Sequence, residues 1–226
     1  MPKSGKQGES DDGIPLQRRS TPSRPHRQAA VTRRSKAIVV TVSSTSQGAV
    51  DAAAEALEAG GVVVMPTDTV YGIMASVQHP AAIERIFSIK TRSSEKPMAV
   101  LVGDLYQALQ LAWFSQEAID HAESGWPGAL TLVLERTPEA SHLSLGGDGN
   151  SIGLRHPDSR FLMQVMERVG PLAATSANRT GEDSGLTVDE IATVFKDSID
   201  LYVDGGRLGS VPSTVISFVG GKKQLR

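Results

Sequence analysis

The residues best suited to bind a ligand are hydroxyl residues, lysines and arginines that stand beside short apolar runs. The clearest group follows Val62 to Met65 and places three hydroxyls and one carboxylate within five positions: Thr67, Asp68, Thr69 and Tyr71. β-branched hydroxyl residues at the end of a strand hold donors and acceptors in a fixed direction. The segment therefore predicts a polar binding loop, although an ordinary turn is the alternative when it is considered alone.

A cluster of cations, Lys90, Arg92 and Lys96, lies within seven positions between a predicted helix and a predicted buried strand. Residues 37–226 hold 14 Lys and Arg against 22 Asp and Glu, so basic residues are scarce in this part of the chain. The helix dipole favours a cation at a helix C-terminus and accounts for Lys90, but not for the two cations beyond it. The cluster predicts an anion site.

Three further strands place polar residues at their ends. Ser151 and Arg155 bound one strand, and Ser213 begins the last. The strand at 171–174 runs into a Ser, Thr, Asn and Gly segment that resembles a phosphate-binding loop. Strand ends are where α/β sheets place their ligands. The five histidines have no metal-ligand spacing and no Ser/His/Asp triad can be assembled, so we predict group transfer by positioning and charge neutralisation.

Composition restricts the class of protein. The 226 residues contain no cysteine, which excludes thiolate catalysis and disulfides and fits a reducing compartment such as the cytoplasm. No apolar run approaches the roughly 20 residues that span a bilayer. Residues 1–36 hold nine Lys and Arg, three Asp and Glu and almost no large apolar residue, so we expect a disordered basic tail. Contact of this tail with RNA is the alternative to a solvated role.

The apolar periodicity predicts one α/β domain over residues 37–226. Strands are expected at 37–42, 62–65, 98–102, 129–135, 151–157, 171–174, 200–204 and 213–219. Helices are expected at 46–58, 79–90, 104–112, 115–123, 158–169 and 187–195, with capping residues such as Ser46, Asp104, Ser115 and Thr187. Residues 220–225 have the composition of a frayed polar terminus.

Six ordered motifs in residues 37–226 resemble the YrdC/Sua5 family. They are Pro66-Thr-Asp-Thr-Val-Tyr-Gly72, Lys90-x-Arg92, Trp126-Pro-Gly128, Gly153-Leu-Arg155-x-Pro157, Ser176-Ala-Asn178 and Pro212-Ser-Thr-Val215. The resemblance implies a twisted mixed sheet with flanking helices around a central cationic cavity. It also implies a threonylcarbamoyl-AMP synthase, which joins L-threonine, bicarbonate and ATP into threonylcarbamoyl-AMP and pyrophosphate for the t6A modification of tRNA.

The resemblance further implies a role for individual residues. Thr69, Arg155, Ala174 and Ser213 would bind L-threonine, with Arg155 pairing its carboxylate through two hydrogen bonds. ATP would be bound by a second group: Arg92, Lys96, Ser151, Ser176, Asn178, Ser184 and Arg226. Lys90 and Arg92 would be the catalytic cations, no metal is expected on protein ligands, and Mg²⁺ would be carried on the ATP phosphates.

Two features depart from the family pattern. Lys96 stands where some members carry Asn, and Val100-Leu101-Val102 lacks a histidine that some members have near threonine. A double-stranded RNA or tRNA-binding module without adenylation activity is the first alternative, disfavoured by the acidic balance and few aromatic residues. A carbamoyl-transfer enzyme of hydrogenase maturation is the second. Possible partners are tRNA and the threonylcarbamoyl-transferase complex; no membrane association is expected.

Overall fold

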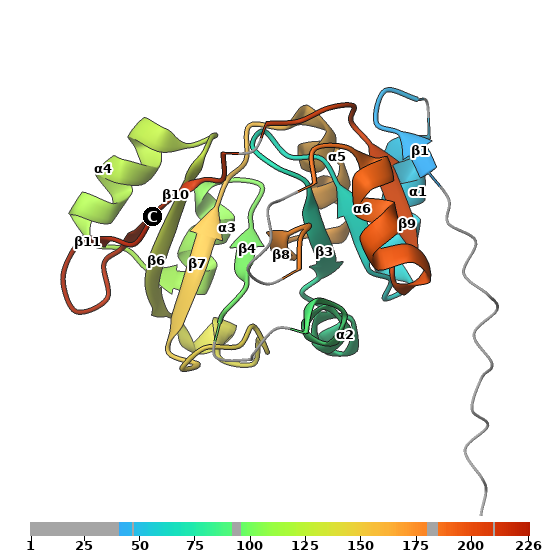
Figure 1. Ribbon diagram of the computed structural model, residues 1–226. Coiled ribbons are helices and arrows are strands. Elements are labelled where there is room, and N and C mark those ends of the chain that lie inside the picture. The colour runs from blue at the N-terminus through green and yellow to red at the C-terminus, as the bar shows by residue number, and fades with distance from the viewer. Residues whose placement is uncertain (1–40, 47, 92–95, 180–184, 210) are drawn as a thin grey trace, which may run out of the picture. The chain divides into compact units, whose positions relative to one another are not determined.

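The computed structural model describes residues 41–46, 48–91, 96–179, 185–209 and 211–226. These residues belong to one compact unit, residues 35–226. The predicted tail boundary at residue 36 lies outside the described residues and stays a prediction. Figure 1 shows a mixed sheet with helices on its two faces, which confirms the predicted α/β class.

In the part of the chain that the structure describes, eleven strands form the sheet. Ten of them follow the order β1-β9-β2-β3-β8-β4-β7-β6-β10-β11, and β5 pairs with β6 outside this path. Their bounds are β1 Thr41–Ser43, β2 Val63–Met65, β3 Gly72–Ser76, β4 Ala99–Leu101, β5 Ala112–Trp113, β6 Leu130–Arg136, β7 Ser151–Arg155, β8 Leu172–Ser176, β9 Leu201–Asp204, β10 Thr214–Ser217 and β11 Lys223–Gln224. The sheet is mixed: the central pairs β2–β3, β3–β8 and β8–β4 are antiparallel, whereas β4 pairs parallel to β7.

The central strands are buried on both faces. Val62 and Val64 pack into one apolar cluster, whereas Val63 and Met65 pack into a second cluster on the opposite face. Successive side chains of a strand point to opposite faces, so an unbroken apolar run is needed where both faces are covered. The predicted buried strand at 62–65 is confirmed.

Six α-helices among the described residues cover these faces. Their bounds are α1 Ala49–Glu58, α2 Pro80–Lys90, α3 Leu105–Leu111, α4 Gln116–Gly125, α5 Arg160–Val169 and α6 Val188–Phe195. Buried residues of α1 and α5 share the cluster that contains Val63, and those of α2, α3, α4 and α6 share the other. Figure 1 accordingly shows α6 in front of the strands and α5 behind them. None of these helices is long and apolar enough to cross a bilayer.

Local sequence signals place several helix ends correctly. Asp104 accepts a hydrogen bond from the backbone N–H of Gln107, and Ser115 and Thr187 cap α4 and α6 in the same way. Pro80 occupies the first turn of α2, where its missing N–H costs no hydrogen bond. The predicted cap at Ser46 is wrong: α1 begins at Ala49 after Gly48, and the Ser46 hydroxyl donates to the carbonyl of Ser43 instead.

Three strands are absent from the sequence-based prediction: β3, β5 and β11. The expectation of a frayed end at 220–225 is wrong, because Lys223 and Gln224 pair antiparallel with Ser217 and Ile216. The backbone N–H of Leu225 also donates to the carbonyl of Val215 at 2.8 Å. This hairpin turns the chain back beside β10 and leaves Arg226 next to Ser213.

Candidate functional site

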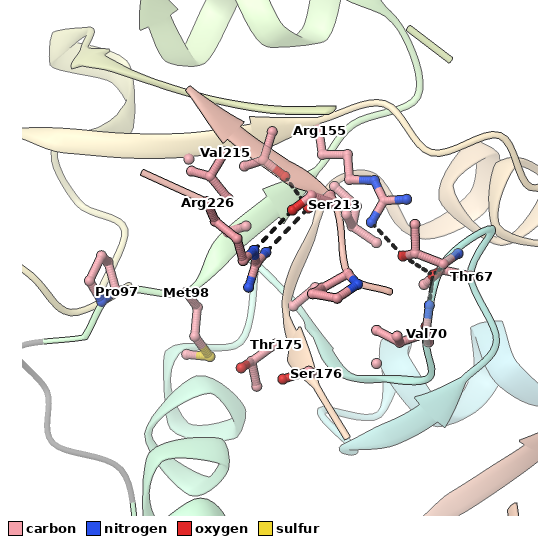
Figure 2. Close-up of a pocket in the computed structure, with 18 of the residues that line it drawn as sticks. Thr67, Val70, Pro97, Met98, Arg155, Thr175, Ser176, Ser213, Val215 and Arg226 are labelled. Carbon is pink, nitrogen blue, oxygen red and sulfur yellow. Dashed lines mark hydrogen bonds between the residues drawn. The ribbon is translucent and has the colours of Figure 1, made fainter. Parts of the chain in front are cut away.

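A cavity of about 800 Å³ opens between the ends of strands from both halves of the sheet. Its wall combines the segment after β2, the start of β4, residues of β6, β7 and β8, the segment before β10 and the C-terminal residues. Figure 2 shows side chains from these separate segments around one space. The volume is within the usual range for small-molecule sites.

Most of the predicted site residues line this cavity. They are Thr69, Lys96, Ser151, Arg155, Ala174, Ser176, Ser213 and Arg226. Arg92 and Ser184 lie outside the described residues. Lys90 and Asn178 lie behind the wall, and both contact the Ser176 segment. Among the described residues, the charged side chains on the wall are Lys96, Arg155 and Arg226.

The loop after β2 is organised by the Thr67 hydroxyl. Its oxygen accepts hydrogen bonds from the backbone N–H groups of Thr69 at 3.0 Å and Val70 at 3.2 Å, and it donates to the carbonyl of Val70 at 2.7 Å. The hydroxyls of Thr67 and Thr69 are 3.0 Å apart. These contacts fix the loop backbone, so the side chain of Thr69 is held against the cavity.

Arg155 ends β7 and has only 6% of its surface exposed. Its Nε donates to the carbonyl of Gly128 at 3.0 Å, Nη1 donates to the hydroxyl of Thr69 at 2.9 Å, and Nη2 donates to the carboxylate of Asp68. A guanidinium carries five N–H donors, so one donor remains on each Nη atom. Two bonds from Arg155 to a ligand carboxylate, as the sequence analysis expects, would have to use these two donors.

Ser213 lies across the cavity and is 5% exposed. Its hydroxyl is 2.9 Å from the hydroxyl of Thr131, a buried residue of β6. Arg226 donates from Nε to the Ser213 carbonyl at 2.9 Å and from Nη2 to the Ser213 hydroxyl at 3.4 Å, as Figure 2 shows. Ser213, which is expected to bind L-threonine, is therefore in direct contact with Arg226, which is expected to bind ATP.

Lys90 is 2% exposed at the end of α2. Its ammonium donates to the carbonyl of Ser176 at 2.6 Å, to the hydroxyl of Thr175 at 3.1 Å and to the side-chain oxygen of Asn178 at 3.4 Å. The hydroxyl of Ser176 donates to the same oxygen of Asn178 at 2.6 Å. Lys90 is thus placed to support the Ser176–Asn178 segment from behind.

Ser151 begins β7 and its hydroxyl donates to the carboxylate of Asp148 at 3.1 Å. Backbone N–H groups of Asn150 and Ser151 bind the same carboxylate and hold the pKa of Asp148 below its usual value. Because the hydroxyl proton points to Asp148, the lone pairs of the Ser151 oxygen are left for a ligand donor. A sugar or amino group suits this position better than a phosphate oxygen.

Two further residues complete the site: Thr131, to which the sequence patterns assigned no role, and Tyr71, which belongs to the predicted polar loop. Thr131 is the hydroxyl partner of Ser213, and a lone threonine inside the apolar strand 129–135 was its sequence signal. Tyr71 lines the cavity and donates to the carbonyl of Gly206 at 2.6 Å, while the N–H of Gly205 donates to its oxygen at 2.9 Å. Burial raises the pKa of Tyr71 to about 12, so the phenol stays a donor at neutral pH. Within the described ranges, no group of three or more His, Asp or Glu is placed to hold a metal ion.

The family model of the Sua5, YciO and YrdC proteins, described as telomere recombination, matches residues 55–226. Threonylcarbamoyl-AMP synthase of Mus musculus is 37% identical over 169 residues, which cover 73% of this chain and 58% of the mouse protein. Threonylcarbamoyl-AMP synthase of Bacillus subtilis (strain 168) is 34% identical over 177 residues, covering 77% of this chain and 51% of that protein. The chain thus spans about half the length of these relatives.

The crystal structure of P. abyssi Sua5 complexed with L-threonine superimposes with a TM-score of 0.76 and 31% identity. The match covers 84% of this chain and 57% of the Sua5 chain. Fold, motif order and sequence similarity agree over the same region. The chain belongs to the Sua5/YciO/YrdC family.

Proposed function

We propose that this chain is an L-threonylcarbamoyladenylate synthase, a nucleotidyltransferase that makes threonylcarbamoyl-AMP and pyrophosphate from L-threonine, bicarbonate and ATP. The observation that carries the proposal is the convergence of the buried residues Thr69, Arg155 and Ser213 on a cavity that Lys96 and Arg226 also line. The names of the mouse and Bacillus relatives support the same activity.

L-Threonine would occupy the part of the cavity between Arg155 and Ser213. The carboxylate would accept the remaining N–H donors of Arg155, and the Ser213 hydroxyl offers a further polar contact. Ala174 lines the cavity beside the residues of β4, with which β8 pairs. The P. abyssi Sua5 structure with L-threonine supports an amino-acid ligand in this fold.

ATP would occupy the remaining part of the cavity. Its phosphates would be bound by Lys96 and Arg226, the two described cations of the wall that remain beside Arg155. Arg92 would also bind them, although it lies outside the described residues. Ser151 suits a ribose or adenine donor because its own proton is committed to Asp148. Asn178 would act through Ser176, and Lys90 would hold both in place.

The reaction needs no protein nucleophile. The threonine amine attacks bicarbonate or CO₂; with bicarbonate the products are a carbamate and water. A carbamate oxygen then attacks the α-phosphorus of ATP, and the bond to the β-phosphate oxygen breaks as pyrophosphate leaves with the electron pair. Because carbamate and triphosphate are both anionic, cations that hold them together lower the barrier. Mg²⁺ would arrive on the ATP phosphates as part of that substrate.

The product would pass to a threonylcarbamoyl-transferase complex that modifies the adenosine next to the anticodon of tRNA. We place this activity in the cytoplasm, as the cysteine-free composition suggests. Ser184 would belong to the ATP-binding group from outside the described residues.

Pyrophosphate release from ATP tests the proposal. We expect release when L-threonine and bicarbonate are both present, and background release when either is omitted. L-Serine should be a poorer substrate because it lacks a methyl contact that contributes about 1 kcal/mol. Arg155→Lys should lower the threonine-dependent rate, while Arg168→Lys should not, since Arg168 pairs with Asp51 and Glu58 outside the cavity. Threonine-independent turnover, or RNA binding without turnover, would overturn the proposal.

A further inference from the structure

Asp68 stands between two residues of the cavity wall but does not line the cavity itself. Thr67 and Thr69 contribute to the wall on either side of it. The Asp68 side chain is 13% exposed and faces Arg155, whose side chain is 8% exposed. Its carboxylate accepts a hydrogen bond from Arg155, another residue of the protein.

The contact fixes the end of a long side chain. Arginine loses much rotamer freedom when its guanidinium is held in one place, so the holding contacts must be strong. Gly128 and Thr69 offer neutral acceptors to Nε and Nη1, and Asp68 offers the charged acceptor to Nη2. Hydrogen bonds between charged groups are the strongest of this kind, so Asp68 contributes most to the orientation.

The arrangement decides which donors of Arg155 a ligand meets. With Nε taken and one donor used on each Nη atom, the two remaining N–H groups are the ones that a substrate carboxylate can accept. Loss of the Asp68 carboxylate would free Nη2 and let the guanidinium turn about its terminal bonds. The remaining donors would then no longer be held in one direction.

We infer that Asp68 is a positioning residue that orients Arg155 for the α-carboxylate of the amino-acid substrate. The inference rests on the proposed function, which supplies the carboxylate. Asp68 acts through Arg155 and touches neither substrate, so its removal should change threonine affinity and leave ATP affinity alone.

The chain offers a matched control in the ion pair of Asp200 with Arg85. Asp200 accepts hydrogen bonds from Arg85 and from the backbone N–H of Val62, and the pair is half-buried, with 16% side-chain exposure for Arg85 and 32% for Asp200. Neither residue lines the cavity. Asp200→Asn therefore reports what the loss of an arginine-paired, half-buried aspartate charge does to the fold alone.

The experiment compares Asp68→Ala and Asp68→Asn with Asp200→Asn and the wild type. We expect Asp68→Ala to raise the KM for L-threonine at least about tenfold, the scale of one charge-assisted hydrogen bond, with the KM for ATP within about twofold. Asp68→Asn keeps the size and one acceptor, so it should recover part of the loss. Asp200→Asn should lower the melting temperature and leave both KM values within about twofold.

A double-mutant cycle separates positioning from a general loss of structure. Arg155→Lys removes the planar guanidinium that Asp68 orients. In this background Asp68→Asn should therefore have little further effect on the KM for threonine. Additive effects of the two substitutions would overturn the inference, as would a normal KM for threonine in Asp68→Asn and Asp68→Ala. If Asp68→Ala does not fold, Asp68→Asn alone gives the comparison. Absence of threonine-dependent turnover in the wild type would instead overturn the proposed function, and this inference with it.

Discussion

Arg226 holds Ser213 by two hydrogen bonds, one to the carbonyl at 2.9 Å and one to the hydroxyl at 3.4 Å. The hairpin of β10 and β11 creates this contact, since Val215 exchanges backbone hydrogen bonds with Leu225 and Arg226. The guanidinium thereby becomes part of the cavity wall, although Arg226 as a whole remains exposed.

Replacing Arg226 with alanine should weaken ATP binding by about one to two decades, because one guanidinium–phosphate pair contributes about 1.5–3 kcal/mol. Threonine binding should weaken less, through the lost contact with Ser213. Calorimetric titration of both ligands measures the two effects. Gln224→Ala is the control, since Gln224 lies in the same hairpin but not on the wall; equal ATP affinity in both variants would contradict the assignment of Arg226.

Thr131→Val should raise the KM for threonine several-fold and lower the free energy of unfolding by about 1 kcal/mol. Valine keeps the shape of threonine and removes the hydroxyl that meets Ser213 at 2.9 Å in a buried setting. Steady-state kinetics and urea unfolding measure the two effects. Thr131→Ser keeps the hydroxyl, so its KM for threonine and its free energy of unfolding should stay close to the wild-type values. An unchanged KM for threonine in Thr131→Val would show that the hydrogen bond from Thr131 is not needed to orient the Ser213 hydroxyl.

Lys90→Met tests whether Lys90 supports the fold or takes part in the chemistry. Methionine preserves the buried apolar stem but removes the three hydrogen bonds to Thr175, Ser176 and Asn178. We expect the free energy of unfolding to fall by about 1–3 kcal/mol and ATP affinity to fall with it, because Ser176 loses its support. Urea unfolding and ATP titration check this, with Lys222→Met as a surface control whose pair with Glu117 contributes little.

A large loss of kcat in Lys90→Met, with normal stability and normal ATP affinity, would instead support the catalytic role predicted for Lys90 from the sequence. The two outcomes are distinct, because a support residue acts on stability and binding together, whereas a catalytic cation acts on the rate.

Tyr71→Phe should make stability less dependent on pH between about 10 and 12. Burial raises the pKa of Tyr71 to about 12 from 10.0, so folding favours the neutral phenol. The stabilisation that Tyr71 provides is complete at pH values below the pKa of the tyrosine in the unfolded state. It is lost as the pH rises through the pKa of Tyr71 in the folded state. At pH 7 the substitution should cost about 1–2 kcal/mol through the contacts with Gly205 and Gly206.

Urea unfolding at pH 7 and at several values above pH 10 checks the Tyr71 prediction. Tyr106→Phe is the matched control, because Tyr106 is 72% exposed. Tyr202 has its pKa raised to about 12 by the same cause, so Tyr71→Phe should reduce the pH dependence without abolishing it. An identical pH dependence in wild type and Tyr71→Phe would mean that Tyr71 ionises alike in both states.

Several elements followed from local sequence because their cause is local. The run at 62–65 is apolar on both faces of a strand, and Asp104, Ser115 and Thr187 cap helices a few residues away. By contrast, β3 has no alternation of polar and apolar residues, and β11 is a polar pair. Both strands exist because a neighbour offers matching backbone donors and acceptors: β2 and β8 for β3, and β10 for β11.

The sequence by itself determined the residue types of the site and the strand ends at which they stand, since turns, hydroxyls and cations are visible as patterns along the chain. The tertiary structure decided what each side chain does. Asp68 meets Arg155 across 87 positions and Lys90 meets Ser176 across 86, and no local pattern encodes such a pairing. Only the order of strands in the sheet brings the two members of each pair together. Burial then requires every polar or charged group to have a hydrogen-bond partner.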